Sequence, residues 1–408
     1  MSKPVPKLRQ TLDVFPSPVE EHPGILLRDP FRYSEEILII PPALVGCLRM
    51  MDGGHTELEL QDYLSKLVGQ EFPLAHIRGF IEELQSCGFL ETAEFEQRRA
   101  HRHAEFAAAP FRAPAHAGAA YPDDAASLRE TLEGWMLSLI PPRTEPIIGI
   151  AAPHVSPDGG WECYAAAYNR LAGMRDELRG KTIVILGTSH YGEPEKFGLT
   201  RKPFKTPFGT IETDTELVDR LAARATDAVT MEDYCHVFEH SIEFQGIFLQ
   251  QMLGNDFKIL PVLCGAFVRS FLTGRAPEKE DGLRRFFESL GEVAESHRDR
   301  LFWVLGIDLA HIGRRYGDPM DVAAETGVML EVREADHRRL AHVCRNQSAE
   351  FFESVHPEHD PLKWCGFTPL YTFMQSVKGA RGNVLKYDQW NIDEQSVVSF
   401  AAMEFSEQ

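Results

Sequence analysis

The hydrophobic pattern of the C-terminal three quarters of the chain alternates between two kinds of segment. Continuous apolar runs of strand length are separated by stretches with helical periodicity, and the runs are residues 147–152, 182–188, 259–263, 302–308 and 396–405. Uninterrupted apolar strands between helices are typical of a sheet that is covered on both faces. We therefore predict a three-layer α/β domain over residues 116–408.

The N-terminal quarter has shorter elements. Residues 24–30 and 35–42 contain short apolar runs that predict strands, and two or three helices follow. The last helix is the clearest, because its apolar residues recur at helical spacing and a Cys-Gly pair can end it: Ile77, Phe80, Ile81, Leu84, Cys87 and Gly88. We predict a small winged-helix-like module over residues 24–92, preceded by a tail over residues 1–23.

Residues 93–115 predict a linker, because charge, alanine and proline are mixed there without a sustained hydrophobic period. His101 and His103 in this segment, and His116 just beyond it, could ligate a metal ion. Histidines in solvated linkers usually have no ligand, so we favour the interpretation without a metal.

The charge balance argues against a general nucleic-acid binder, because 42 Lys and Arg face 61 Asp and Glu, a net charge of -19. Seven scattered cysteines without a CxxC pair favour a reduced, cytoplasmic protein. The first residues carry proline and charge where a signal peptide needs an apolar stretch. The longest apolar run, residues 37–48, contains Pro41 and Pro42 and is shorter than the roughly 20 residues of a membrane helix. We expect neither a membrane segment nor a nucleic-acid partner.

Three of the predicted strands each lead to a histidine: His154, His190 and His311. Ser189 precedes His190, and Asp308 stands three residues before His311. The loops beyond the carboxyl edge of an α/β sheet commonly hold its functional site. One such histidine would more often be structural. Three together predict a metal site or acid/base machinery, because imidazole ligates borderline transition metals and titrates near neutrality.

A fourth polar cluster lies at the start of a predicted helix, where Glu239, His240, Ser241 and Glu243 occur in the run FEHSIEF. The helix dipole favours acidic residues in a first turn, which gives Glu243 a sufficient structural explanation. His240 would share a helix face with Glu243, an arrangement that can orient an imidazole toward a substrate or a metal. Both interpretations stay open.

A cysteine opens the last predicted helix, where Cys365 and Gly366 precede the apolar run FTPLYTFMQSV. A thiol at a helix N-terminus has a lowered pKa, and its thiolate form binds metal or reacts. A cysteine that enters an apolar helix more often fills the core. Spacing alone therefore does not favour Cys365 over Cys264.

Ordered motifs over about residues 110–408 give the chain a specific likeness to one family. The motifs are AGAAYPDDAASLRETLEGW, AAPHVSPDGGWECYAAAY, VILGTSHYGEPEKFGLTRKPFKTPFGTIETDTELVDRL, EHSIEFQ, ILPVLCGAF, GIDLAHIG and WCGFTPLY. In this order they resemble the Memo family, in the form known as AmmeMemoRadiSam system protein B. The family is similar in fold to the class III extradiol dioxygenases, which are non-haem iron enzymes.

The resemblance implies a metal site with the ligands His154, His190 and Cys365, in which the cysteine stands where the dioxygenases have a carboxylate. It implies one transition metal ion per chain, with Fe(II) or copper preferred and zinc next. The soft thiolate favours copper or zinc relative to a hard oxygen donor, so ring cleavage does not follow from the fold. The motif at the first histidine, His154, reads APHVSPDGGW where many members read APHAGY, so the rim of the site differs.

The resemblance also implies roles around the metal. His311 takes the acid/base position of the dioxygenases, and Asp308 and His240 line the same cleft as further catalytic candidates. We expect Ser189 and Glu243 to contact the substrate.

Residues 24–92 resemble the PqqD-like winged-helix modules that bind peptides in radical-SAM modification systems. The likeness rests on LRDPFRYSEEILIIPPALVGCLRMMDGGHTELELQDYL and FIEELQSCGFLE, in which Thr56 can cap a helix. The acidic balance of this module disfavours DNA, so a peptide or protein partner is expected. The family name implies a radical-SAM protein and an AMMECR1-like protein as further partners.

Two functions from different classes follow. The first is a non-haem metal-dependent, dioxygenase-like oxidoreductase that acts with a radical-SAM-associated system. The alternative is a non-catalytic scaffold on the same fold that binds a peptide or handles copper or iron. A metal-free hydrolase has little support, because Ser189 and Ser241 only adjoin histidines in sequence and the chain has no GxSxG motif.

Overall fold

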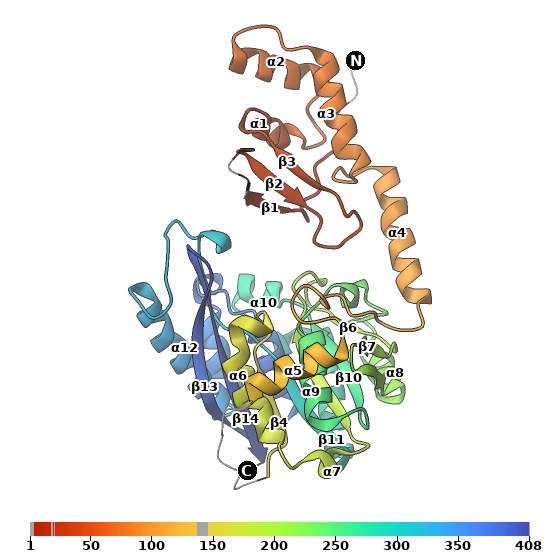
Figure 1. Cartoon of the computed structure of the whole chain (residues 1–408), viewed down its shortest axis with the longest axis vertical. Coiled ribbons are helices and arrows are strands. Elements are labelled where there is room, and N and C mark those ends of the chain that lie inside the picture. Colours follow the sequence, from red (N-terminus) through yellow and green to blue (C-terminus); the bar gives the residue numbers. More distant parts are fainter. Residues whose placement is uncertain (1–3, 18, 20, 137–145, 408) are drawn as a thin grey trace. The chain divides into compact units, whose positions relative to one another are not determined.

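A computed structural model describes residues 4–17, 19, 21–136 and 146–407 (Figure 1). The chain divides into two units, Met1–Ala108 and Ala109–Gln408, which we call unit 1 and unit 2. In the described residues, no helix combines the length and the apolar character that crossing a bilayer requires.

Unit 1 joins a small antiparallel sheet to helices. The sheet has the order β1-β2-β3, and the elements are β1 (Asp13–Pro16), β2 (Ile25–Arg28), β3 (Ile37–Ile40), α1 (Pro42–Met50), α2 (Glu57–Val68), α3 (Leu74–Ser86) and α4 (Ala93–Ala108). The predicted strands β2 and β3 and the predicted helix α3 are confirmed, and all four apolar residues predicted on α3 are buried. Thr56 caps α2 through a capping box with Glu59, as its place after MDGGH predicts.

The segments expected to be a tail and a linker both contain regular structure. Val5 and Leu12 are buried in the core of unit 1, and the buried Arg9 pairs with Asp29 at 2.9 Å. Residues 93–108 form α4 instead of an irregular linker. Its alanine, glutamate and arginine residues favour a helix by propensity alone, and the buried Phe95 and Phe106 are too few to give a hydrophobic period.

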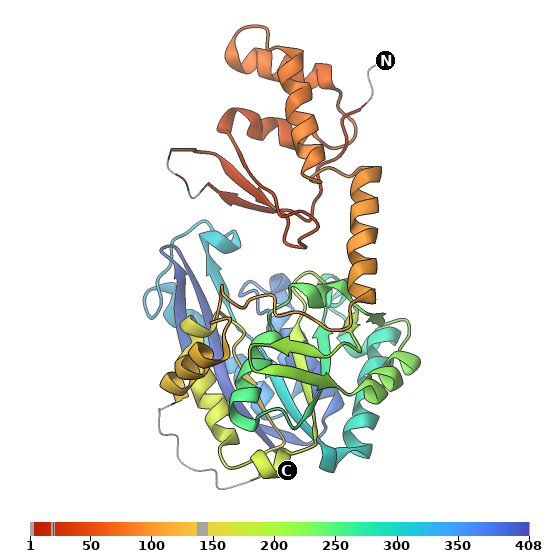
Figure 2. The same ribbon diagram turned by 45° about the vertical axis from the view of Figure 1, so that its right-hand side comes forward.

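Unit 2 is built on one mixed sheet (Figure 2). In the described residues the sheet has eleven strands and the main order β12-β14-β4-β11-β5-β10-β6-β9. The strands are β4 (Gly149–Ala152), β5 (Thr182–Thr188), β6 (Phe197–Leu199), β7 (Phe204–Thr206), β8 (Gly209–Thr213), β9 (Val229–Met231), β10 (Lys258–Cys264), β11 (Leu301–Gly306), β12 (His311–Gly313), β13 (Ala380–Asp393) and β14 (Ser396–Glu407). All five strands predicted in this unit are present. The short strands β6 to β9 and β12 and the long β13 are additions that the apolar runs do not indicate.

Helices cover both faces of this sheet (Figures 1 and 2). They are α5 (Ala125–Met136), α6 (Pro157–Tyr168), α7 (Arg175–Leu178), α8 (Thr215–Arg224), α9 (Glu243–Leu253), α10 (Val268–Thr273), α11 (Asp281–Ser296), α12 (Val328–Cys344), α13 (Ser348–Val355) and α14 (Phe367–Ser376). Helices α5, α6 and α9 pack together, whereas α11 and α13 pack on α14. The mixed α/β class is therefore as predicted.

The four central strands β4, β11, β5 and β10 are parallel, so their carboxyl ends meet at one edge. Gly306 at the end of β11 is level with Ala152 on β4 and with Gly187 on β5. A Cβ atom on Gly306 would lie 2.2 Å from the backbone oxygen of Ser241, and one on Gly187 would lie 2.4 Å from the Ser241 hydroxyl. The two glycines therefore let the loop before α9 lie directly on the strand ends.

Candidate metal centre

His154 follows β4 and is fixed by two hydrogen bonds. Its Nδ1 lies 2.9 Å from the backbone oxygen of Gly306, and its backbone N–H donates to Asp308 Oδ1 at 2.9 Å. Because a carbonyl oxygen only accepts, Nδ1 carries the proton and Nε2 has a free lone pair. Only 1% of His154 is exposed. The side chain is thus held as a neutral imidazole with one nitrogen available to a ligand.

His190, after β5, is held by the buried Glu239. The Glu239 carboxylate lies 3.0 Å from His190 Nδ1 and accepts the backbone N–H of His190 at 2.9 Å. The same carboxylate accepts the backbone N–H of His240 at 2.9 Å and lies 3.2 Å from His240 Nδ1. One acidic side chain therefore orients two imidazoles and leaves Nε2 of each free.

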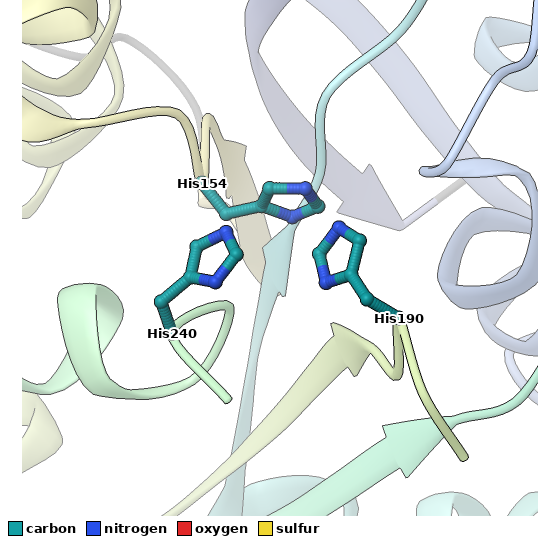
Figure 3. Close-up of side chains that lie close together, drawn as sticks. All are labelled: His154, His190 and His240. Atoms are coloured by element: carbon teal, nitrogen blue, oxygen red, sulfur yellow. The ribbon is translucent and has the colours of Figure 1, made fainter. Parts of the chain in front are cut away.

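Three imidazoles converge at the carboxyl edge of the sheet (Figure 3). The rings of His190 and His240 are stacked with centroids 4.9 Å apart, and the ring of His154 lies 5.0 Å from the first and 5.3 Å from the second. Each ring offers one nitrogen, and these three atoms lie within 4.8 Å of one another. The arrangement can hold a metal ion that accepts nitrogen ligands.

A second group of donors contains Cys365, which stands two residues before the start of α14. His154, Asp308 and Cys365 offer atoms within 4.8 Å of one another, and Cys365 Sγ lies 3.2 Å from His154 Nε2. The expected ligands His190 and Cys365 thus belong to different groups that share His154. Cys264, the alternative that spacing left open, is buried in the hydrophobic core.

The expectation that the helix N-terminus lowers the pKa of Cys365 is wrong for the protein without a metal ion. Burial raises the pKa of this thiol well above its usual value, and the nearby Asp308 carboxylate raises it further. Desolvation of a thiolate outweighs the helix dipole here. A bound cation would reverse this balance, because metal coordination deprotonates a thiol.

Burial and charge set different protonation preferences for the imidazoles. Burial lowers the pKa of His154 and lowers that of His240 well below the usual value. Burial alone would do the same at His190, but the Glu239 carboxylate outweighs it and raises the pKa. Burial would raise the pKa of Glu239 itself, yet His190 holds it well below the usual range. Glu239 therefore places a buried negative charge next to His190 and His240.

His311 lies outside both donor groups. Its Nδ1 lies 3.0 Å from the backbone oxygen of Leu309 and 3.2 Å from that of Lys363, so Nδ1 carries the proton and Nε2 is the free nitrogen. Burial lowers its pKa to about 4. His311 is therefore neutral at neutral pH.

The predicted substrate contacts of Glu243 and Ser189 gain no support from this geometry. The Glu243 carboxylate pairs with Arg112 and accepts hydrogen bonds from the Tyr121 hydroxyl and from the backbone N–H groups of Ala115 and His116. Glu243 is the first residue of α9, but its carboxylate is occupied by hydrogen-bond donors of the protein itself. Ser189 is also buried, at 6% exposure.

Three residues missed from the sequence support the site. Arg112, 1% exposed, donates to the backbone oxygens of His236 at 2.7 Å and of Glu239 at 2.8 Å, and so fixes the loop before α9. Glu239 had no assigned role, although it stood in the predicted cluster. His116, just beyond the predicted linker and there judged without a metal, places its ring 5.7 Å from that of His240. The partners of Arg112 and His116, and the partner His190 of Glu239, are distant in sequence, so no local pattern could have indicated these contacts.

We predict that Arg112→Ala lowers the free energy of unfolding of unit 2 by about 3–5 kcal/mol, because Glu243 is left as a buried, uncompensated charge. Tryptophan fluorescence in urea reads this unit selectively, since residues 1–108 contain no tryptophan. Arg284→Ala, at an exposed arginine of α11, is the matched control and should change the midpoint little. A loss below about 1 kcal/mol in Arg112→Ala would contradict the assigned role.

We also predict that acid destabilises unit 2 through His236, which lies 3.2 Å from the backbone oxygen of Gly198. Burial lowers its pKa from 6.5 to about 4, so the unfolded chain takes up a proton first as the pH falls. The stability contribution is full above pH 6.5 and is lost toward pH 4, by about 3 kcal/mol. His236→Gln should remove that part of the pH dependence, whereas His337→Gln, at an exposed histidine, should keep it. Equal pH dependence in the wild type and His236→Gln would refute the assignment.

Comparisons with known proteins find relatives that cover most of the chain. A MEMO1 family protein of Aquifex aeolicus is 25% identical over 386 residues, which cover 93% of this chain and 95% of the relative. A MEMO1 family protein of Methanosarcina acetivorans is 26% identical over 302 residues, which cover 72% of this chain and 98% of the relative. The Aquifex alignment must therefore extend into unit 1, whereas the shorter archaeal relative has about the length of unit 2.

A crystal structure of an uncharacterized Escherichia coli K12 protein covers 64% of this chain and 99% of its own at 12% identity and a TM-score of 0.39. The family comparison is stronger. The family model for Memo-like proteins matches residues 112–404, a range that includes both donor groups of the candidate metal centre. The chain therefore belongs to the Memo-like protein family.

Proposed function

We propose that unit 2 is a non-haem, metal-dependent oxidoreductase that binds one transition metal ion, with Fe(II) or copper preferred and zinc next. The observation that carries the proposal is the convergence of two donor groups on His154 at the carboxyl edge of the sheet. The donors are imidazole, thiol and carboxylate, a set that suits iron, copper and zinc better than Mg²⁺ or Ca²⁺.

His154, His190 and Cys365 are the proposed ligands. The support is orientation: Gly306 binds Nδ1 of His154 and Glu239 binds Nδ1 of His190, so the Nε2 atoms are the nitrogens left for a metal ion, and Nε2 of His154 lies 3.2 Å from the Cys365 thiol, the third proposed ligand. Such contacts to the non-ligating nitrogen fix the tautomer and raise the basicity of the ligating one. Iron or copper bound there would supply Lewis acidity and electron exchange.

His311 is the proposed proton acceptor. Its Nδ1–H donates to backbone oxygens, so Nε2 can take a proton from a substrate hydroxyl. With a pKa of about 4 it is already unprotonated at neutral pH. Asp308 binds the backbone N–H of His154 through Oδ1, which leaves Oδ2, 3.5 Å from His154 Nε2, on the side of the site. Asp308 and His240 would line the same cleft as further catalytic candidates.

We predict that the purified protein binds one equivalent of iron or copper and that the double variant His154→Ala, His190→Ala loses this binding. The reason is that both free imidazole nitrogens are removed, whereas His311→Ala removes none and should keep the metal. Equilibrium dialysis with metal analysis measures the stoichiometry. His101→Ala, at an exposed histidine of α4, controls for surface binding. One equivalent bound by the double variant would overturn the site.

The alternative is a scaffold that binds a peptide or handles a metal ion without catalysis, and unit 1 favours it. Its three-stranded sheet has β1 and β3 as edge strands, and Val14 and Ile37 on these strands are 53% and 55% exposed. An extended peptide can add a strand to such an edge. For either function, the proposed partners are a peptide or protein bound by unit 1, with a radical-SAM protein and an AMMECR1-like protein as candidates.

Oxygen consumption separates the two functions. We expect anaerobically purified protein loaded with Fe(II) to consume oxygen in the presence of a catechol-type substrate, because an oxidoreductase must turn over. His311→Ala should retain its iron and lose the activity, since only the proposed proton acceptor is removed. Absence of oxygen uptake by the iron-loaded wild type across such substrates would favour the scaffold.

A further inference from the structure

Asp336 on α12 is a buried carboxylate that the proposed chemistry does not use. It is 0% exposed, and its oxygens accept hydrogen bonds from three side chains: Trp364 Nε1 at 2.7 Å, the Tyr387 hydroxyl at 2.8 Å and the Ser399 hydroxyl at 2.6 Å. All three donors are neutral, and burial raises the pKa of Asp336 to about 6. Keeping a carboxylate charged in such a place costs free energy, and buried polar groups of this kind can serve to fix one arrangement among several.

One oxygen of Asp336 holds the residue that precedes Cys365. Oδ1 accepts the indole N–H of Trp364 at 2.7 Å. The backbone N–H of Trp364 donates to Asp360 at 2.6 Å, and Arg339, which pairs with Asp360 at 2.8 Å, lies over the Trp364 ring at 5.3 Å. The indole is therefore held at its N–H and on its face, which fixes the direction from which the chain enters Cys365.

The other oxygen of Asp336 supports the loop that leads to His311. Oδ2 accepts the Ser399 hydroxyl at 2.6 Å, and the oxygen of that hydroxyl accepts the backbone N–H of Ala310 at 2.9 Å. The backbone of Ser399 adds two bonds, one from the Leu309 N–H at 2.8 Å and one to the Ala310 oxygen at 2.9 Å. Because Asp336 accepts the hydrogen bond of the hydroxyl, the hydroxyl oxygen keeps its lone pairs for the residue next to His311.

The two supported loops meet at His311. Its backbone N–H donates to the Leu362 oxygen at 2.9 Å, and its Nδ1 lies 3.2 Å from the Lys363 oxygen. Both acceptors belong to the loop that continues to Cys365. Asp336 therefore supports, through one intermediate side chain each, the loop of the proposed thiolate ligand and the loop of the proposed proton acceptor.

We infer that Asp336 is a positioning residue of the candidate centre. Through Trp364 it sets the place of the Cys365 sulfur relative to the imidazoles, and through Ser399 it sets the place of His311. The inference rests on the proposed function, because it adds no group that touches the metal ion or the substrate. It goes beyond that function, since a carboxylate outside both donor groups then decides whether the thiol and the imidazole can act together.

Asp336→Asn tests this role with little change of volume. The amide keeps one acceptor oxygen but turns an NH2 group toward donors, so the bonds to Trp364 and to the two hydroxyls cannot all form. Co(II) is the probe, because a cobalt–thiolate bond gives an intense near-ultraviolet charge-transfer band. We expect the full-length variant to bind Co(II) about 10-fold more weakly than the wild type and to show a weaker band per bound ion. Equilibrium dialysis and absorption spectroscopy measure the two quantities separately.

Two further variants separate the two oxygens of Asp336. Trp364→Phe removes the indole N–H and should weaken the band as Asp336→Asn does. Combining these two substitutions should cause no larger loss than Asp336→Asn alone, because both break the same bond. Ser399→Ala should leave the band unchanged, since this side chain leads to His311 and not to Cys365.

Asp214→Asn is the matched control for a general loss of stability. Asp214 is also buried, at 5% exposure, and accepts the Thr182 hydroxyl at 2.6 Å and the Leu217 backbone N–H at 3.3 Å. Thr182 begins β5, so this carboxylate lies at the edge of the sheet opposite the site. The control should keep the wild-type Co(II) affinity and band. Circular dichroism in urea shows that each variant is folded and how much stability it has lost.

An unchanged cobalt–thiolate band in Asp336→Asn and Trp364→Phe overturns the inference and leaves the metal site intact. An equally weakened band in Asp214→Asn overturns it as well, because the loss would then be general. Should Asp336→Asn fail to fold, Trp364→Phe alone decides. A wild type that binds Co(II) without the band, or does not bind it, overturns the ligand set of the proposed function and the inference with it. A weaker band in both Asp336→Asn and Trp364→Phe, with the wild-type band in the other two variants, supports the inference.

Discussion

One buried carboxylate holds the candidate centre together. Glu239 accepts the backbone N–H groups of His190, His240 and Ser241 and lies beside Nδ1 of both histidines. It therefore ties the loop after β5 to the loop before α9 and fixes the tautomers of two rings with one group. A buried anion is costly unless it is neutralised or bonded, and at Glu239 both conditions are met by the side chains and backbone that it positions.

A second buried carboxylate, Glu243, stabilises the same loop from the other side. Its pairing with Arg112 brings a guanidinium to the backbone oxygens of His236 and Glu239. Two acidic residues four positions apart thus have separate tasks, one toward the imidazoles and one toward the arginine. The surroundings of each carboxylate, more than its residue type, decide whether it faces the site or the supporting structure.

Much of the fold could be predicted because buried parallel strands leave continuous apolar runs, as in Thr182–Thr188. The same strand ends predicted that His154 and His190 would lie at one edge. Cys365 came from the family resemblance, because local spacing cannot separate a cysteine in a site from Cys264 in the core. Arg112 could not be predicted, since its partners are more than 120 positions away and a buried ion pair leaves no periodic signal.

The glycines at the strand ends have a consequence for comparing Memo-like chains. Even one methyl group on Gly187 or Gly306 would meet Ser241 at a distance that atoms do not tolerate. A family member with a larger residue at Gly306 must carry the neighbouring segment, and with it the Glu239 carboxylate, farther from the sheet, whereas a larger residue at Gly187 must displace the side chains of Ser241 and Ile242. These two positions can therefore serve as sequence markers that sort relatives with an intact pocket from those in which it has been remodelled.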